Sequence, residues 1–136
     1  MLVAHFTLAY WCVLIAALLP IVCSAIAKSG GSKSRRQGGF DNDDPRGWLA
    51  RQTDWRARAN AAQANSFEAL PFFIGAIVIA HQLGAQQARL DILAFVYLVL
   101  RLMYIMFYVG GLSTLRTSVW IGGLWVNIAI LFSGYR

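Results

Sequence analysis

A stretch near the middle of the chain carries polar side chains at helical spacing directly before an apolar run. Arg58, Asn65 and Glu68 are seven and three residues apart, so a helix places them along one stripe of its surface. Pro71 follows, and after it comes an uncharged run over residues 72–80. Burying an unpaired carboxylate in apolar surroundings is costly, so other helices must cover this stripe.

A second polar series lies further along the chain and is cationic and rich in hydroxyl groups. Arg101, Tyr104 and Tyr108 follow one another at spacings of three and four residues, again on one stripe of a helix. Arg116 stands at the start of the next apolar segment. Guanidinium and phenol groups beside an apolar phase suit an anionic, polar ligand that meets a lipophilic one.

Each of these seven residues also has a purely structural interpretation. An amide and a carboxylate inside a membrane can join neighbouring helices, an arginine can be their counter-ion, and a tyrosine can anchor a helix end. Convergence from three segments favours a site over these alternatives. No His, Cys, Asp and Glu residues stand at metal-ligand spacing, and no phosphate-binding glycine motif or Ser–His–Asp pattern is present, so no metal site is expected.

The composition places these residues in a membrane. The chain has 136 residues, of which 58% are hydrophobic and 13% charged, and its mean hydropathy is +0.55. About 25% charged residues would be typical of a soluble domain. Four segments are long and apolar enough to span a bilayer, over about residues 2–27, 55–83, 88–109 and 114–132. The sequence therefore predicts one all-α membrane domain over residues 1–136, an up-and-down bundle of four transmembrane helices.

The first apolar segment has a rival interpretation as a cleaved signal peptide, because residues 25–27 imitate a small-x-small cleavage site. No Lys or Arg precedes the run, however, and the run is longer than a signal core, so we expect a transmembrane helix. Cys12 and Cys23 lie about 16 Å apart along its axis, too far to form a disulfide with each other. We interpret both as packing residues.

Basic residues are concentrated on one side of the predicted domain. Six lie in the hydrophilic loop over residues 28–54 and three more lie close to it, whereas two, Arg89 and Arg136, lie on the other side. The positive-inside rule therefore makes the loop cytoplasmic and places both termini outside the cytoplasm. Acidic residues dilute the cations of the loop, and no recognition helix or aromatic platform accompanies them, so nucleic acid is not an expected partner.

The depth of two ionisable residues can be compared along the predicted helices. At a rise of about 1.5 Å per residue, Glu68 lies roughly 20 Å from His81 and Arg101 roughly 15 Å from Asp91. The two therefore lie at similar depth in the cytoplasmic half, and we expect Glu68 and Arg101 to be electrostatically coupled. His81 is expected to be isolated at the opposite interface.

Together these motifs resemble the MAPEG family, the membrane-associated proteins in eicosanoid and glutathione metabolism, and in particular its short bacterial-type members. The similarity extends over all four predicted spans. It rests on Asn65-x-x-Glu68-x-x-Pro71, on Arg101-x-x-Tyr104-x-x-x-Tyr108 and on Leu115-Arg116-Thr117.

The resemblance implies a homotrimer in a bacterial inner membrane, surrounded by lipid, that binds glutathione between subunits near the cytoplasmic face. Family enzymes conjugate glutathione to lipophilic electrophiles, reduce lipid hydroperoxides or isomerise an endoperoxide. By motif position Arg116 would be the catalytic residue, because a nearby guanidinium lowers the pKa of a thiol and the thiolate is the nucleophile. The residues that would hold glutathione are Arg58, Asn65, Glu68, Arg101, Tyr104 and Tyr108.

Two functions stay open, and the sequence does not identify the thiol, the second substrate or the physiological role. One is a glutathione-dependent transferase or peroxidase that acts on a lipophilic small molecule, which Arg116 and the two tyrosines favour. The other is a non-catalytic lipid-binding or scaffold protein with the same fold. Ala61 favours the second, because several glutathione-using family members carry an arginine at this position, seven residues before Glu68.

Overall fold

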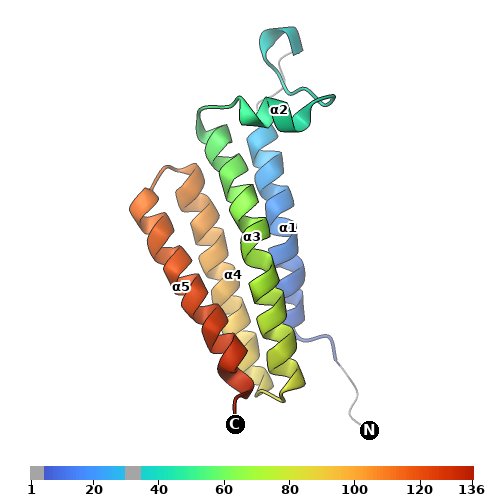
Figure 1. Ribbon diagram of the computed structural model, residues 1–136, viewed down its shortest axis with the longest axis vertical. Coiled ribbons are helices and arrows are strands. Elements are labelled where there is room, and N and C mark those ends of the chain that lie inside the picture. Colours follow the sequence, from blue (N-terminus) through green and yellow to red (C-terminus); the bar gives the residue numbers. More distant parts are fainter. Residues whose placement is uncertain (1–4, 30–34) are drawn as a thin grey trace.

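Four long helices run up and down side by side in the computed structural model (Figure 1), which confirms the predicted all-α bundle. The structure describes residues 5–29 and 35–136. The long helices are α1 (Leu8–Lys28), α3 (Trp55–Gln82), α4 (Gln87–Val109) and α5 (Ser113–Leu131). Within the described residues these four are long and apolar enough to cross a membrane.

Helix α1 begins at Leu8 and not near residue 2, where the apolar sequence predicted its start. Thr7 adopts an extended conformation and its side chain accepts a hydrogen bond from the Tyr10 backbone N–H, at 3.3 Å. Asp91 of α4 accepts a second one from the Ala9 backbone N–H, at 3.0 Å. A helix begins where oxygen atoms accept hydrogen bonds from the unpaired N–H groups of its first turn. Hydropathy alone does not show where such acceptors lie.

The loop between α1 and α3 contains a helix that the sequence analysis did not predict, α2 (Pro45–Ala50), preceded by a single 3-10 turn over Arg35–Gln37. Asp44 caps α2 by accepting a hydrogen bond from the Gly47 N–H at 3.1 Å, and proline at the first position is already shaped for a helix. Trp48 is buried, and its indole N–H donates to the Gly38 carbonyl at 3.3 Å. Helix α2 therefore lies across the ends of α1 and α3 (Figure 1).

The core is made by pairs of helices. Helix α1 packs chiefly on α3, and α5 chiefly on α4, while α3 and α4 contact each other across the middle. Cys12 and Cys23 are buried and free, as expected for packing residues. Phe73 is fully buried and its ring stacks on Tyr97 of α4, with 4.3 Å between the ring centroids.

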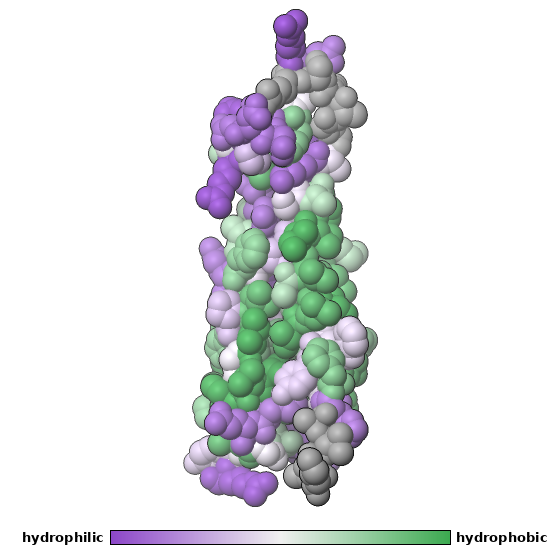
Figure 2. Space-filling view, turned by 90° about the vertical axis from the view of Figure 1, so that its right-hand side faces the viewer, coloured by the Kyte–Doolittle hydropathy of each residue, from purple (hydrophilic) through white to green (hydrophobic). Residues whose placement is uncertain are grey.

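The outer surface of the long helices is apolar over most of its height. Figure 2 shows a hydrophobic band between two hydrophilic ends. Large apolar side chains that point outward occur on all four long helices, for example Ile21, Val78, Ile92 and Trp125. A surface of this kind suits the hydrocarbon of a bilayer, so the chain is an integral membrane protein.

A polar network holds the end of the bundle opposite α2. His81 belongs to this network, so the prediction that it is isolated is wrong. The ring of His81 stacks on Tyr10 of α1 at 4.6 Å, and its Nε2 lies 3.0 Å from Oε1 of Gln87. The Gln87 amide donates to Asp91 at 2.7 Å. These contacts join three helices, which sequence periodicity cannot show because they depend on how the helices are rotated.

Candidate functional site

The candidate residues of the sequence analysis lie on three helices, toward the end that carries α2. Asn65 and Glu68 belong to α3, and Arg116 to the first turn of α5. The stripe from Arg101 through Tyr104 to Tyr108 belongs to α4 and approaches its last residue. Contacts between these helices decide which of the side chains meet.

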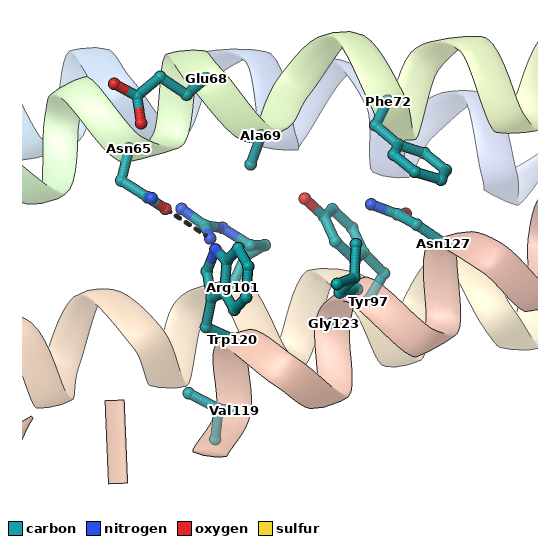
Figure 3. Close-up of a pocket in the computed structure, with 11 residues that line it drawn as sticks. Asn65, Glu68, Ala69, Phe72, Tyr97, Arg101, Val119, Trp120, Gly123 and Asn127 are labelled. Atoms are coloured by element: carbon teal, nitrogen blue, oxygen red, sulfur yellow. Dashed lines mark hydrogen bonds between the residues drawn. The ribbon is translucent and has the colours of Figure 1, made fainter. Parts of the chain in front are cut away.

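Arg101 is buried, at 5% exposure, and neutral oxygen atoms hold it. Its Nη1 donates to Oδ1 of Asn65 at 3.0 Å and its Nη2 donates to Oγ of Ser66 at 3.1 Å. The predicted ion pair with Glu68 is wrong, since Glu68 is exposed and makes no ion pair among the described residues. In Figure 3 the Asn65 amide, and not the Glu68 carboxylate, reaches the guanidinium.

This arrangement leaves the charge of Arg101 without a counter-ion in the described part of the chain. Hydrogen bonds from amide and hydroxyl oxygens satisfy its N–H groups but do not neutralise it. A buried cation of this kind attracts an anion strongly, because the surrounding dielectric is low. Arg101 is therefore suited to bind a carboxylate from outside the chain.

A continuous stack of side chains links Arg101 to Arg116. The Arg101 guanidinium lies 4.2 Å from the Tyr104 ring centroid, and Tyr104 meets Tyr108 edge to face at 5.6 Å. Arg116 of α5 lies over the other tyrosine, 4.4 Å from the Tyr108 centroid. We call Arg101, Tyr104, Tyr108 and Arg116 the Arg–Tyr stack. Cation–π contacts of this type orient both guanidinium groups.

Arg58 contacts the backbone and not the Arg–Tyr stack. Its Nε donates to the carbonyl of Val109, the last residue of α4, at 2.9 Å. A cation that binds the free carbonyls at a helix C-terminus stabilises that helix end. Gly111, with φ of +75°, forms the turn to α5 next to the Arg58 side chain. Arg58 thus holds the turn that positions Arg116.

A cavity of about 220 Å³ lies between α3, α4 and α5 (Figure 3). Asn65, Glu68 and Arg101 line one end of it, and Phe72 and Trp120 belong to its apolar walls. At the other end lie two polar residues that sequence reasoning missed, Tyr97 and Asn127. A signal for both was available, because Tyr97 extends the stripe of Arg101 by one turn and Asn127 is an amide inside an apolar segment.

The donor set of the site indicates the kind of ligand. Guanidinium, phenol and amide groups donate hydrogen bonds to carboxylates and thiolates, and Glu68 can accept them from an ammonium group. Within residues 5–29 and 35–136 no group of three or more His, Cys, Asp or Glu side chains could hold a metal ion. The arrangement suits a small zwitterionic or anionic molecule.

Comparison with known proteins identifies a family that the chain matches. The model of the MAPEG family matches residues 8–135, a range that includes all four long helices and the whole Arg–Tyr stack. No curated protein and no solved structure matches the chain.

Proposed function

The chain belongs to the MAPEG family, and from this premise we propose that it is a glutathione-dependent transferase or peroxidase for lipophilic molecules. The observation that carries the proposal is the pair of cations at the two ends of the Arg–Tyr stack. Neither Arg101 nor Arg116 forms an ion pair among the described residues. Two oriented, unneutralised guanidinium groups at one site match a ligand with several negative charges.

The polar groups of the site fit glutathione, which carries two carboxylates, one ammonium group and a thiol. Arg101 would bind a carboxylate, with Asn65 holding its guanidinium in place. Glu68, exposed and free of ion pairs in the described chain, would accept hydrogen bonds from the ammonium group. The rings of Tyr104 and Tyr108 lie between the two cations in the stack, and their hydroxyl groups would donate hydrogen bonds to the tripeptide.

Arg116 would act on the sulfur. It lies in the first turn of α5, where the helix dipole also favours negative charge, and a fixed cation stabilises a thiolate over a thiol. When bound, glutathione supplies a nucleophilic sulfur that can form a bond to an electrophilic carbon or reduce a hydroperoxide. Phe72 and Trp120, at 40% and 41% exposure, border the cavity and would admit the lipophilic partner from the membrane.

A second candidate is a non-catalytic lipid-binding or scaffold protein. Two observations favour it. Ala61 stands where several glutathione-using family members carry an arginine, and the Arg58 guanidinium already donates a hydrogen bond to the Val109 carbonyl. The site would then contain fewer free cations than in several glutathione-using relatives, and the cavity would hold lipid.

Thiol binding separates the two candidates. Calorimetry on the purified protein in nanodiscs is expected to give saturable binding of glutathione, and thiolate absorbance is expected to appear near neutral pH. S-methylglutathione should bind without the absorbance, because it has no ionisable sulfur. The Arg89→Ala variant, altered at an exposed cation on the opposite end of the bundle, should behave like the wild type. If no thiol gives heat or thiolate absorbance, the lipid-binding alternative replaces the enzyme.

The proposal includes assembly as a homotrimer. Glu68 lies on α3 among exposed apolar side chains such as Phe67 and Phe72, so in a monomer its carboxylate would face lipid. Placing a charge in hydrocarbon is costly, and a neighbouring subunit would remove that cost. The protein mass measured in mild detergent is expected to be that of three chains, and a strictly monomeric mass would contradict the assembly.

The proposal also places α2 in the cytoplasm of a bacterial cell and both termini outside it, with the chain in the inner membrane. The support is the excess of Lys and Arg at the α2 end of the chain. A membrane-impermeant maleimide added to intact cells should label Gln86→Cys, at the opposite end, but not Asn42→Cys near α2. Both positions are exposed, whereas the natural Cys12 and Cys23 are buried. The reverse labelling pattern would invert the orientation.

A further inference from the structure

His81, in the last turn of α3, has an oxygen atom facing each of its two ring nitrogens. Its Nδ1 lies 2.9 Å from the backbone carbonyl oxygen of Ile77, and its Nε2 lies 3.0 Å from Oε1 of Gln87. These oxygens only accept hydrogen bonds, whereas a neutral imidazole has one N–H and one bare nitrogen. Both contacts are hydrogen bonds only when the ring carries two protons, which is its cationic form.

The orientation of the Gln87 amide decides this reading, because rotation of the amide exchanges its oxygen and its nitrogen. In the orientation observed, Nε2 of Gln87 donates to Oδ1 of Asp91 at 2.7 Å. The same Oδ1 accepts from the Ala9 backbone N–H at 3.0 Å, as a carboxylate does. The rotated amide would place its oxygen against that of Asp91, unless Asp91 took up a proton. In either orientation the group holds one proton more than a neutral imidazole and a carboxylate.

We call Tyr10, His81, Gln87 and Asp91 the His81 network. From α1 the Tyr10 ring stacks on His81, with 4.6 Å between the centroids and 23° between the planes, which suits a flat cation. The buried thiol of Cys12 on α1 lies near Asp91. Asp91 of α4 is the only acidic residue after Glu68 in the sequence, so it supplies the negative charge at this end. The other titratable or charged side chains of the described chain at this end are exposed, namely His5, Arg89, Tyr135 and Arg136.

The network joins three helices, so the extra proton bears on how they are held together. Without it, the bare Nε2 of His81 would face the Gln87 oxygen, or the turned amide would face the Asp91 carboxylate. One hydrogen bond is lost in either case, and Asp91 is also the residue that caps the first turn of α1. His81, Gln87 and Asp91 are each partly exposed, so water can deliver and remove the proton.

We propose that the His81 network is a proton-binding site that fastens the start of α1 to α3 and α4 and loosens it when the proton leaves. The folded chain then binds one more proton than the unfolded chain at the same pH, so its stability falls as the pH rises and the proton is lost. In the orientation proposed above, the site faces away from the cytoplasm and responds to the pH outside. The inference requires no thiol and is independent of the proposed enzyme activity.

Nitrogen NMR of the imidazole ring tests the protonation directly. The chain has two histidines, so His5→Gln leaves His81 as the only one in a sample labelled with ring-15N histidine. At pH 7.5 a free histidine is about nine-tenths neutral. In nanodiscs at this pH, both ring nitrogens of His81 are expected to give signals of protonated nitrogen. His81→Gln supplies the spectrum of the exposed His5 for comparison.

Variants of the two partners show whether the network holds the proton. In the His5→Gln background, Gln87→Leu removes the acceptor at Nε2, and Asp91→Asn removes the balancing charge and lets the Gln87 amide turn its N–H toward the ring. In both, His81 is expected to lose the Nε2 proton at pH 7.5 and to keep the Nδ1 proton on the Ile77 carbonyl. Gln82→Leu, at an exposed glutamine next to His81, should leave both signals unchanged.

Two further measurements follow the start of α1. Exchange of the Ala9 amide hydrogen, compared at one pH, should be about tenfold faster in Gln87→Leu than in Gln82→Leu. Between pH 6 and pH 8.5 the melting temperature of the wild type should fall further than that of His81→Gln, because every other titratable group is the same in both.

Any of three results would overturn the inference. One is a neutral His81 ring at pH 7.5 with the network intact, and another is a doubly protonated ring that persists in Gln87→Leu. The third is an equal pH dependence of melting in the wild type and His81→Gln. The NMR comparison remains decisive if a variant melts early, because it reads the ring in protein that is folded at the temperature of measurement.

Discussion

Replacing Arg116 with alanine is expected to slow glutathione conjugation by about 100-fold or more, while thiol binding weakens far less. A fixed cation beside the sulfur stabilises the thiolate and the charge of the transition state more than it stabilises the bound thiol. Turnover of a lipophilic electrophile, measured together with calorimetric binding of S-methylglutathione, separates the two effects. An Arg116→Ala protein that conjugates as fast as the wild type would show that the assignment is wrong.

The competing interpretation is that Arg116 only anchors α5 at lipid phosphate. Arg116→Lys distinguishes the two, because a lysine serves as an anchor but lacks the planar fork that stacks on the Tyr108 ring. We expect Arg116→Lys to recover part of the rate, and full recovery would favour the anchor. Arg46→Ala is the control, since Arg46 is an exposed cation of α2 at the same end of the bundle.

The helices and the stripes along them could be predicted from the sequence because they depend on local patterns. The length of the apolar segments predicted four spans, and the spacing of Arg101, Tyr104 and Tyr108 placed them on one face of α4. The rings do meet in that order, and Arg116 joins them because the turn after α4 is tight. Short connections left little freedom in how α4 and α5 pair.

The partner of Arg101 could not be predicted, because depth along a helix does not give rotation about its axis. Glu68 follows Asn65 by three positions, which places its side chain about 60° from Asn65 around the helix, on the side opposite to Ser66. The guanidinium reaches the face of α3 that contains Asn65 and Ser66, whereas Glu68 lines the same cavity but is exposed and makes no ion pair in the described chain. The sequence did not indicate a role for Ser66, because serine is common in helices and its presence does not predict a contact with an arginine.

Helix starts and the far end of the cavity depend on tertiary contacts in the same way. Asp91 caps α1 from α4, across a sequence separation that no local pattern contains. Tyr97 and Asn127 meet only because α5 comes close to α4 at Gly123. An asparagine inside a membrane span suggests a functional site in any sequence. Its position relative to Tyr97, however, depends on how α4 and α5 pack and cannot be predicted from the sequence.

Double-mutant cycles are expected to show that Arg101 is coupled to Ser66 and not to Glu68. Ser66→Ala removes one of the oxygens that hold a buried guanidinium and should cost about 1 to 3 kcal/mol in the free energy of unfolding. Once Arg101→Met has removed the charge, the same change should cost less, so the cycle should give a coupling of about 0.5 to 3 kcal/mol. Unfolding in mixed detergent, followed by tryptophan fluorescence, measures all four proteins.

Glu68→Gln supplies the matched comparison. It alters a carboxylate on the same helix that makes no ion pair with Arg101 in the described chain, so its effect on unfolding should add to that of Arg101→Met. Coupling between Glu68 and Arg101 as large as that of Ser66 would contradict the observed hydrogen bonds. Unfolding in the presence of glutathione tests the same hydrogen bonds. Because neutral oxygens hold Arg101 and leave its charge available, glutathione should raise the unfolding free energy of the wild type and of Ser66→Ala. In Arg101→Met this increase should be largely lost, since the carboxylate of the ligand would then meet a methionine.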